Sequence, residues 1–334
     1  MPKLLQGPTG RHGILQIHPT RRCNLRCLHC YSQSGPEERA ELEASLIEAV
    51  LEDAARLGFD VLAVSGGEPF LYRGLAQVLT RAKELGLFTS VTTNGTLLST
   101  TRLRLLVGLV DLLAISVDGQ PGSHNEIRAS PDAFERLVQG LPKLRATGMP
   151  FGFIFTLTQY NLHELEWVAN FALEQGARLL QIHPLEPAGR ALVQMEGSVP
   201  DSIESSYALL EATRLQHQYE GRLNIQLDLS YRPEAERVYA GTQCEASDDL
   251  ASLVSPLVLE TDGTLVPLEY GFARRYALGS IHQARLATLA PRWRAEVYPA
   301  FRKLCEGVFT SQTAASAPPV FNWYEAVSQA ASLR

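Results

Sequence analysis

Three of the five cysteines stand close together in one short segment. Cys23, Cys27 and Cys30 form a CxxxCxxC run that follows the apolar segment Ile14–His18. Three thiolates at this spacing can each bind one iron of a [4Fe–4S] cluster and leave the fourth iron without a protein ligand. A closed zinc site is the alternative, but it needs a fourth ligand, for which His29 is the local candidate. The spacing therefore favours a cluster with one iron open to chemistry.

A second segment with chemical potential is Ser65–Pro69, which reads SGGEP. Gly66 and Gly67 let a backbone approach a ligand closely, and Pro69 stiffens the turn. The carboxylate of Glu68 could accept a hydrogen bond from an ammonium group. Gly-Gly turns followed by a solvated glutamate are common, so this motif alone indicates little.

The order of these and later motifs resembles that of the radical S-adenosylmethionine (radical SAM) superfamily. The cysteine motif has His29 before its last cysteine, and the later motifs are GGEP at 66–69, TTNG at 92–95, SVDG at 116–119 and HNEIR at 124–128. The resemblance covers about residues 13–191. It implies S-adenosylmethionine and one [4Fe–4S] cluster as cofactors.

The resemblance also implies a role for each matching residue. The open iron would bind the amino and carboxylate groups of the methionine part of S-adenosylmethionine. The Gly66–Glu68 loop would bind the amino group, and Arg128 would bind the carboxylate. Asn94, Ser116 and Asp118 would lie near the ribose or the substrate, and His29, His183 and Pro184 would border the adenine.

Two of these assignments have simpler alternatives. Arg128 could instead pair on the surface with Glu126 or Asp132, and exposed pairs are usually worth less than about 1 kcal/mol. Ser116 and Asp118 have the spacing that points two side chains to the same side of a strand, so both could face a common site. The alternative for Asp118 is an ordinary Asp-Gly turn.

The reaction that the resemblance implies is a one-electron reduction of S-adenosylmethionine. Cleavage would yield a 5′-deoxyadenosyl radical, which removes a hydrogen atom from the substrate. An external reductant, a flavodoxin or a ferredoxin, is expected. We expect a ribosomal peptide or a peptide-like natural-product precursor as substrate, with a sugar nucleotide or a tetrapyrrole-type metabolite as the alternative. A non-catalytic iron–sulfur or zinc regulator is the alternative from another class.

The C-terminal part contains a segment, residues 256–270, that resembles the SPASM or twitch extension of many peptide-modifying members. Leu268 stands where that extension has a cysteine. Cys244 and Cys305 are too few for a second cluster, so we expect a degenerate extension without one, which mildly favours redox-neutral chemistry. Either cysteine could donate a hydrogen atom to a substrate radical, as in related epimerases, or be a small buried apolar residue.

The elements that must position these residues alternate between short apolar, β-branched runs and segments of helical period. This alternation predicts an α/β fold, a partial (β/α)6 TIM-like barrel over residues 1–191 with a smaller C-terminal α+β domain over 192–334. The predicted barrel strands are Ile14–His18, Val61–Val64, Thr89–Thr93, Leu112–Ser116, Gly152–Thr158 and Leu179–Pro184. In the C-terminal part we expect a helix at Asp201–Glu220, a strand at Leu223–Leu229, and two strands around an Asp262-Gly263 turn.

The composition is that of a soluble globular protein of 334 residues, with 45% hydrophobic residues and a formal net charge of −6. This charge provides no field that would collect nucleic acid, and we expect no nucleic-acid partner. The chain contains no apolar run long enough for a membrane span and no signal peptide, so no membrane partner is expected. The few, unevenly spaced cysteines fit a reducing, cytoplasmic location.

Overall fold

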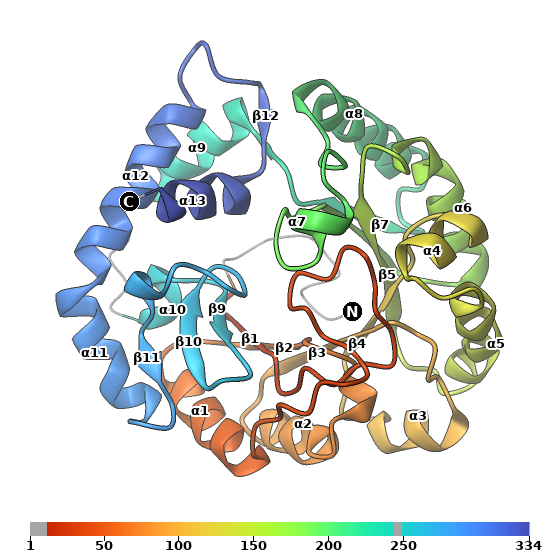
Figure 1. The fold of residues 1–334 in the computed structure, drawn as a ribbon, viewed down its shortest axis with the longest axis horizontal. Helices are drawn as coiled ribbons and strands as arrows, with labels where there is room; N and C mark the ends of the chain where they lie inside the picture. The colour runs from red at the N-terminus through yellow and green to blue at the C-terminus, as the bar shows by residue number, and fades with distance from the viewer. Residues whose placement is uncertain (1–11, 243–248, 334) are drawn as a thin grey trace.

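One sheet of ten strands is the framework of the molecule, which we describe from a computed structural model for residues 12–242 and 249–333 (Figure 1). Its strands are β1 (Ile14–Ile17), β2 (Val61–Val64), β3 (Phe88–Thr93), β4 (Leu112–Ser116), β5 (Phe151–Leu157), β6 (Leu179–Pro184), β7 (Asn224–Leu227), β9 (Leu257–Leu259), β10 (Thr264–Pro267) and β11 (Gly279–Ser280). Their order across the sheet is β11-β10-β9-β1-β2-β3-β4-β5-β6-β7. Strands β1 to β7 run parallel, and β9 is parallel to β1. A separate antiparallel pair joins β8 (Ser230–Tyr231) to β12 (Val320–Phe321).

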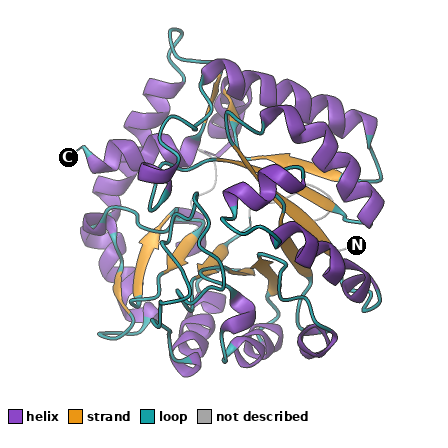
Figure 2. Ribbon diagram, turned by 45° about the vertical axis from the view of Figure 1, so that its right-hand side comes forward, coloured by secondary structure: helices purple, strands orange, loops and turns teal. Residues whose placement is uncertain are grey.

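Helices surround the outer face of this curved sheet, as Figures 1 and 2 show. Those between the barrel strands are α1 (Ala44–Arg56), α2 (Leu75–Glu84), α3 (Thr100–Leu106), α4 (Pro121–Ile127), α5 (Ala133–Arg145) and α6 (Leu165–Gln175), with the 3-10 turns η2 (Pro69–Leu71) and η3 (Leu162–Glu164). The later helices are α7 (Ala191–Gln194), α8 (Ser202–Gln218), α9 (Arg232–Thr242), α10 (Leu250–Leu253), α11 (Leu286–Glu296), α12 (Tyr298–Gln312) and α13 (Trp323–Ser332), with the 3-10 turn η4 (Arg274–Tyr276).

Hydrophobic patterning explains how helices and strands pack together. Helix α1 buries Ile47, Val50, Leu51 and Ala54, which lie on one face at helical spacing. All five residues of β4 are buried, as expected for a parallel strand that is covered on both sides. The helices therefore cover one side of the sheet, and the concave side remains for the loops and the candidate site.

The predicted fold class, α/β with a parallel sheet, is confirmed. The six expected barrel strands are present, and their ends differ from the predicted ends by at most one residue. The described strands do not close into a full barrel, because the sheet ends at β11 on one side and at β7 on the other. A partial barrel is therefore the correct description.

The C-terminal strands extend the same sheet. Strand β9 pairs with β1, and β7 pairs with β6. Leu257, Val258 and Leu259 are completely buried and belong to the same hydrophobic core as the barrel strands. The sequence pattern predicts these strands but not their partners. The division into domains at residues 191 and 192 stays a prediction, within a sheet that both parts share.

Within residues 12–242 and 249–333, every helix is too short or too polar to span a bilayer.

Candidate active site

A cavity of about 570 Å³ opens on the concave side of the sheet. The inner-face residues of the barrel strands line its base, among them Gln16, Ala63 and Ser90. Loops at the carboxyl ends of these strands line its mouth, and this is the edge at which parallel α/β sheets build their sites. The cavity therefore lies where the sequence motifs were expected to meet.

The three cysteines of the CxxxCxxC run line this cavity. Cys23 and Cys27 are buried, and Cys30 is partly exposed. Each sulfur has a polar neighbour: the amide of Asn94 lies 3.9 Å from Cys23 Sγ, Arg128 Nη1 lies 3.7 Å from Cys27 Sγ, and the Ser32 hydroxyl lies 3.5 Å from Cys30 Sγ. Such donors stabilise negative charge on thiolate ligands.

The protonation of these thiols depends on what they bind. Burial, and then the negative charge of Glu68, raise the pKa of Cys23 to about 12, and burial also raises the pKa of Cys27. A metal must displace these protons, because it is the thiolate that acts as a ligand. Because these thiols have polar neighbours and two of them are buried, they suit a strongly bound, positively charged group.

The geometry of the cysteines fits a cluster better than a single zinc ion. Within residues 12–242 and 249–333, no three His, Cys, Asp or Glu side chains lie close enough together to hold one metal ion. Zinc ligands must converge on one point, whereas the thiolates of a [4Fe–4S] cluster each bind a different iron. The three-cysteine set beside an open cavity matches the second arrangement.

The GGEP loop is packed directly against the cysteine loop. The backbone N–H of Gly67 donates to Thr20 O at 2.7 Å, and that of Glu68 donates to Arg22 O at 2.9 Å. A Cβ atom on Gly67 would lie 2.2 Å from Arg22 O, so a larger residue does not fit there. The glycine is therefore needed for the contact between the two loops.

Glu68 lies behind this loop rather than in the cavity wall. Its carboxylate is completely buried and accepts hydrogen bonds from Thr93 Oγ1 at 2.8 Å, Asn94 N at 2.9 Å and Phe70 N at 3.1 Å. Burial raises its pKa. Glu68 thus ties the end of β3 to the GGEP loop, while Gly66 and Gly67 line the cavity.

Arg128 forms a buried ion pair with Asp118. Arg128 Nε donates to Asp118 Oδ2 at 2.5 Å, and Asp118 Oδ1 accepts from Thr156 N at 3.2 Å. Burial opposes ionisation of Asp118, but the guanidinium of Arg128 holds the pKa of that carboxyl well below its usual range. The alternative of a surface pair with Glu126 or Asp132 is wrong, because the Arg128 side chain is buried and pairs with Asp118.

Asp118 and Ser116 do not face the cavity together. Ser116 lines it, whereas Asp118 is fully buried behind Arg128. Strand β4 ends at Ser116, so the alternation of a strand does not continue to Asp118. The Asp118 carboxylate therefore orients Arg128, whose side chain lines the cavity.

Two histidines surround the same ion pair. His29 lines the cavity with Nε2 at 3.9 Å from Asp118 Oδ2, and burial lowers its pKa to about 4. Its Nδ1 is buried without a hydrogen-bond partner in the described part of the chain. His124 Nδ1 accepts from the backbone N–H of Asp118 at 3.1 Å. The neutral ring of His29 leaves one polar atom for a ligand.

The remaining predicted cofactor residues also reach the cavity. Asn94, His183 and Pro184 line it, and His183 Nδ1 pairs with Asp228 at the end of β7. Leu268 lines the cavity as well. Pro69 is buried in the turn that follows the GGEP loop.

The two candidate hydrogen donors have a different outcome. Cys305 lies on α12, packs against the main hydrophobic core, and is not among the residues that line the cavity. Cys244 lies outside the described residues. The position of Cys305 fits its alternative reading as a small, partly buried apolar residue.

Arg190 has a role that sequence reasoning missed. Its Nε donates to Cys27 O at 2.9 Å, and its Nη2 donates to Ser34 O at 2.8 Å. A Cβ on the preceding Gly189 would lie 2.2 Å from Tyr31 O, so this Gly-Arg pair fits closely against the cysteine loop. A Gly-Arg pair just after the last barrel strand is the signal that could have identified it.

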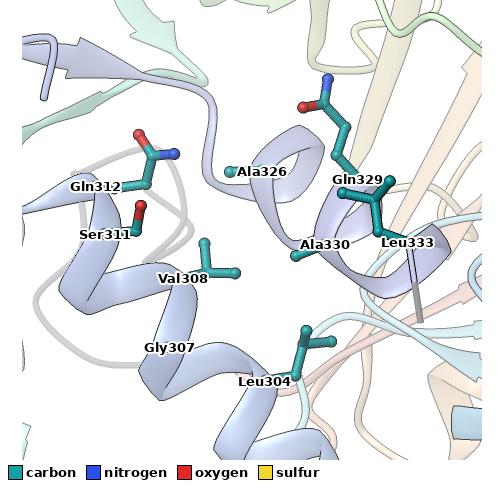
Figure 3. A pocket seen from close by; sticks show the side chains of 9 residues that line it. All are labelled: Leu304, Gly307, Val308, Ser311, Gln312, Ala326, Gln329, Ala330 and Leu333. Atoms are coloured by element: carbon teal, nitrogen blue, oxygen red, sulfur yellow. The ribbon is translucent and has the colours of Figure 1, made fainter.

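A second cavity, of about 360 Å³, lies between α12 and α13 (Figure 3). Its lining consists of apolar, Gly, Ser and Gln side chains. None of these lining residues is a His, Cys, Asp, Glu, Lys or Arg, so this cavity offers no acid, base or metal ligand. The chemistry belongs to the larger cavity.

Comparison with known proteins agrees with this geometry. Residues 17–172 match the family model of the Radical SAM superfamily, and this part of the chain is a radical SAM domain. Members are enzymes whose cofactors are S-adenosylmethionine and a [4Fe–4S] cluster, so the resemblance to this superfamily and the expected cofactors are confirmed. The degenerate SPASM or twitch extension stays a prediction.

Particular relatives are more distant. The chain is 30% identical to the Fe-coproporphyrin III synthase of Methanosarcina barkeri over 220 residues, which are 64% of this chain and 55% of that protein. It is 28% identical to the PqqA peptide cyclase of Methylorubrum extorquens over 269 residues, 78% of this chain and 69% of that protein. The chain thus spans about half the length of the first of these curated relatives.

A solved structure shows the same fold. Streptococcus suis SuiB bound to precursor peptide SuiA superposes with a TM-score of 0.70 over 95% of this chain and 76% of SuiB, at 15% identity. At this identity the likeness concerns the fold alone.

Proposed function

We propose that the protein is a radical SAM enzyme that removes a hydrogen atom from a peptide or peptide-like substrate. The observation that carries the proposal is that Cys23, Cys27 and Cys30 open into the same cavity as the GGEP loop and Arg128. When bound, the cluster and S-adenosylmethionine together supply reductive cleavage to a 5′-deoxyadenosyl radical.

The residues of this chain bind and orient the reactants. Arg128, held by Asp118, would bind the carboxylate of S-adenosylmethionine, and the backbone of Gly66 and Gly67 would bind its amino group. Asn94 and Ser116 would lie near the ribose or the substrate. His29, His183 and Pro184 would border the adenine. A substrate that fills the cavity would limit access of water to the reacting atoms. A flavodoxin or ferredoxin would supply the electron.

A peptide substrate is supported by the relative whose printed name is PqqA peptide cyclase. A tetrapyrrole-type metabolite is the second candidate, supported by the relative named Fe-coproporphyrin III synthase. The two differ in charge, because coproporphyrin carries several carboxylates. The electrostatics of the cavity can therefore discriminate between them.

Anaerobic reconstitution with iron and sulfide, followed by S-adenosylmethionine and dithionite, tests the proposed chemistry. We expect 5′-deoxyadenosine as a product, and its loss in Cys27→Ala. About four irons per chain support a single cluster, whereas about eight would contradict a C-terminal extension without one. An intact cluster that yields no 5′-deoxyadenosine would refute the proposal.

A further inference from the structure

One side of the large cavity carries carboxylates from three separate segments. Glu186 follows β6, Asp228 follows β7, and Glu269 follows β10; all three line the cavity. We call these three residues the acidic wall. The three carboxylates come from distant parts of the sheet, because β6 and β10 lie toward its opposite ends.

The acidic wall lacks a matching set of cations. Two arginines line the cavity, Arg128 and Arg190, and both are bound to the cysteine loop or to Asp118. His183 pairs with Asp228 and is the basic side chain that reaches the wall among the described residues. One imidazole can neutralise one carboxylate at most. Within the described residues, the acidic wall therefore has more carboxylates than basic side chains to pair with them.

Glu186 is the carboxylate left without a partner. Glu269 accepts from the Ser328 hydroxyl, and Asp228 accepts from His183. No side chain in the described part of the chain donates to the Glu186 carboxylate, which lines the cavity and is partly exposed. A cationic donor on a ligand can therefore reach this carboxylate and form a charge-assisted hydrogen bond with it.

The negative charges of the acidic wall raise the pKa values of neighbouring carboxyl groups. Burial, and then the charge of Glu186, raise the pKa of Glu269 to about 8, and burial also raises the pKa of Glu186. The groups that face the wall from neighbouring elements are His183, Glu325 and Tyr324, and Glu325 adds further negative charge. A cation brought between these carboxylates would stabilise their ionised forms.

We infer that the acidic wall binds a cationic group of the substrate, an ammonium or a guanidinium, and so selects a peptide with a basic side chain or free amino terminus. The inference rests on the proposed function, which places the substrate in this cavity. A polycarboxylate such as coproporphyrin would bring its carboxylates against those of the acidic wall, and the repulsion between like charges disfavours its binding.

A binding experiment without turnover tests the inference. Protein reconstituted with its cluster and saturated with S-adenosylmethionine, but not reduced, is titrated calorimetrically with N-acetyl-lysine methylamide and with the neutral N-acetyl-norleucine methylamide. We expect the lysine probe to bind at least roughly tenfold more tightly than the norleucine probe. The norleucine probe lacks the ammonium group that would form a charged hydrogen bond with the acidic wall. Glu186→Gln should remove this difference.

Control variants separate binding at the wall from general electrostatics. Glu196→Gln changes an exposed carboxylate that does not line the cavity, and it should leave the lysine preference unchanged. If Glu186→Gln does not fold, Glu269→Gln serves as the second variant, with retained affinity for S-adenosylmethionine as evidence of an intact cavity. Equal affinities for the two probes, or a lysine preference that survives in both folded variants, would overturn the inference.

Proton linkage gives a second readout that an adventitious surface contact would not produce. At neutral pH Glu269 is largely protonated, so binding of the lysine probe should release a proton and tighten as the pH rises toward the pKa of about 8. Calorimetry in two buffers of different ionisation enthalpy measures this release, which should disappear in Glu269→Gln. Failure of 5′-deoxyadenosine formation alone would leave the wall's preference intact and overturn only the proposed reaction.

Discussion

Replacement of Asp118 by Asn is expected to destabilise the apoprotein strongly. The carboxylate is completely buried, and its partner Arg128 is 7% exposed. Asn can still accept from Thr156 N, but it leaves the guanidinium without an anion at the 2.5 Å contact. Removing one partner of a buried ion pair typically costs about 3–5 kcal/mol, a large part of the roughly 5–15 kcal/mol that stabilises a domain.

Urea denaturation of the apoprotein, followed by circular dichroism, measures this loss. The matched control is Asp132→Asn, which breaks the exposed pair with Arg136 and should cost less than about 1 kcal/mol. The double variant Asp118→Asn, Arg128→Met removes both charges and should recover much of the stability. The reasoning fails if Asp118→Asn costs no more than Asp132→Asn, or if the double variant is as unstable as the single one.

The pH dependence of the same variant has a definite sign. Because the folded-state pKa of Asp118 lies below its unfolded value of 3.8, the ionised carboxylate stabilises the fold above that value. The difference in stability between wild type and Asp118→Asn should be constant from about pH 7 to about pH 5 and shrink below about pH 4. A difference that instead grows on acidification would contradict the assigned pair.

Three further substitutions test the site. Gly67→Ala should clash with Arg22 O and lower the iron content after reconstitution, whereas Gly122→Ala, whose Cβ would meet nothing within 4 Å, should leave it unchanged. Arg190→Lys keeps the charge but loses the planar pair of donors, each worth about 1.5–3 kcal/mol, so chelator should strip iron faster. Cys305→Ala should leave the yield of substrate product unchanged by mass spectrometry, because Cys305 does not line the cavity.

The features that could be predicted from the sequence are those with a local signal. The six predicted barrel strands are short apolar runs between helical segments, and their bounds agree with the structure to within one residue. The cysteines form one short motif after the first predicted strand, and Gly66 and Gly67 form another after the second. Their joint place at the strand ends therefore follows from the sheet alone.

The features that could not be predicted depend on contacts between distant segments. Arg190 reaches Cys27 across 163 positions of the sequence, so the Gly-Arg pair could mark Arg190 as a candidate but could not indicate its partner. The acidic wall brings together Glu186, Asp228 and Glu269 from three loops, each of which resembles an ordinary solvated glutamate or aspartate in sequence. The pairing of β9 with β1 joins residues more than 200 positions apart, so hairpin signals alone do not reveal it.

The manner in which the cysteine loop is held bears on which substitutions affect the site. The three cysteines lie within eight residues, yet the hydrogen bonds that shape their loop come from the segment after β2 and from Arg190 after β6. Bringing such distant segments together costs conformational entropy, and the formation of the sheet offsets this cost. Contacts that involve no metal thus help to hold the cysteine loop, so a change in the segment after β2 or at Arg190 alters the site without touching a cysteine.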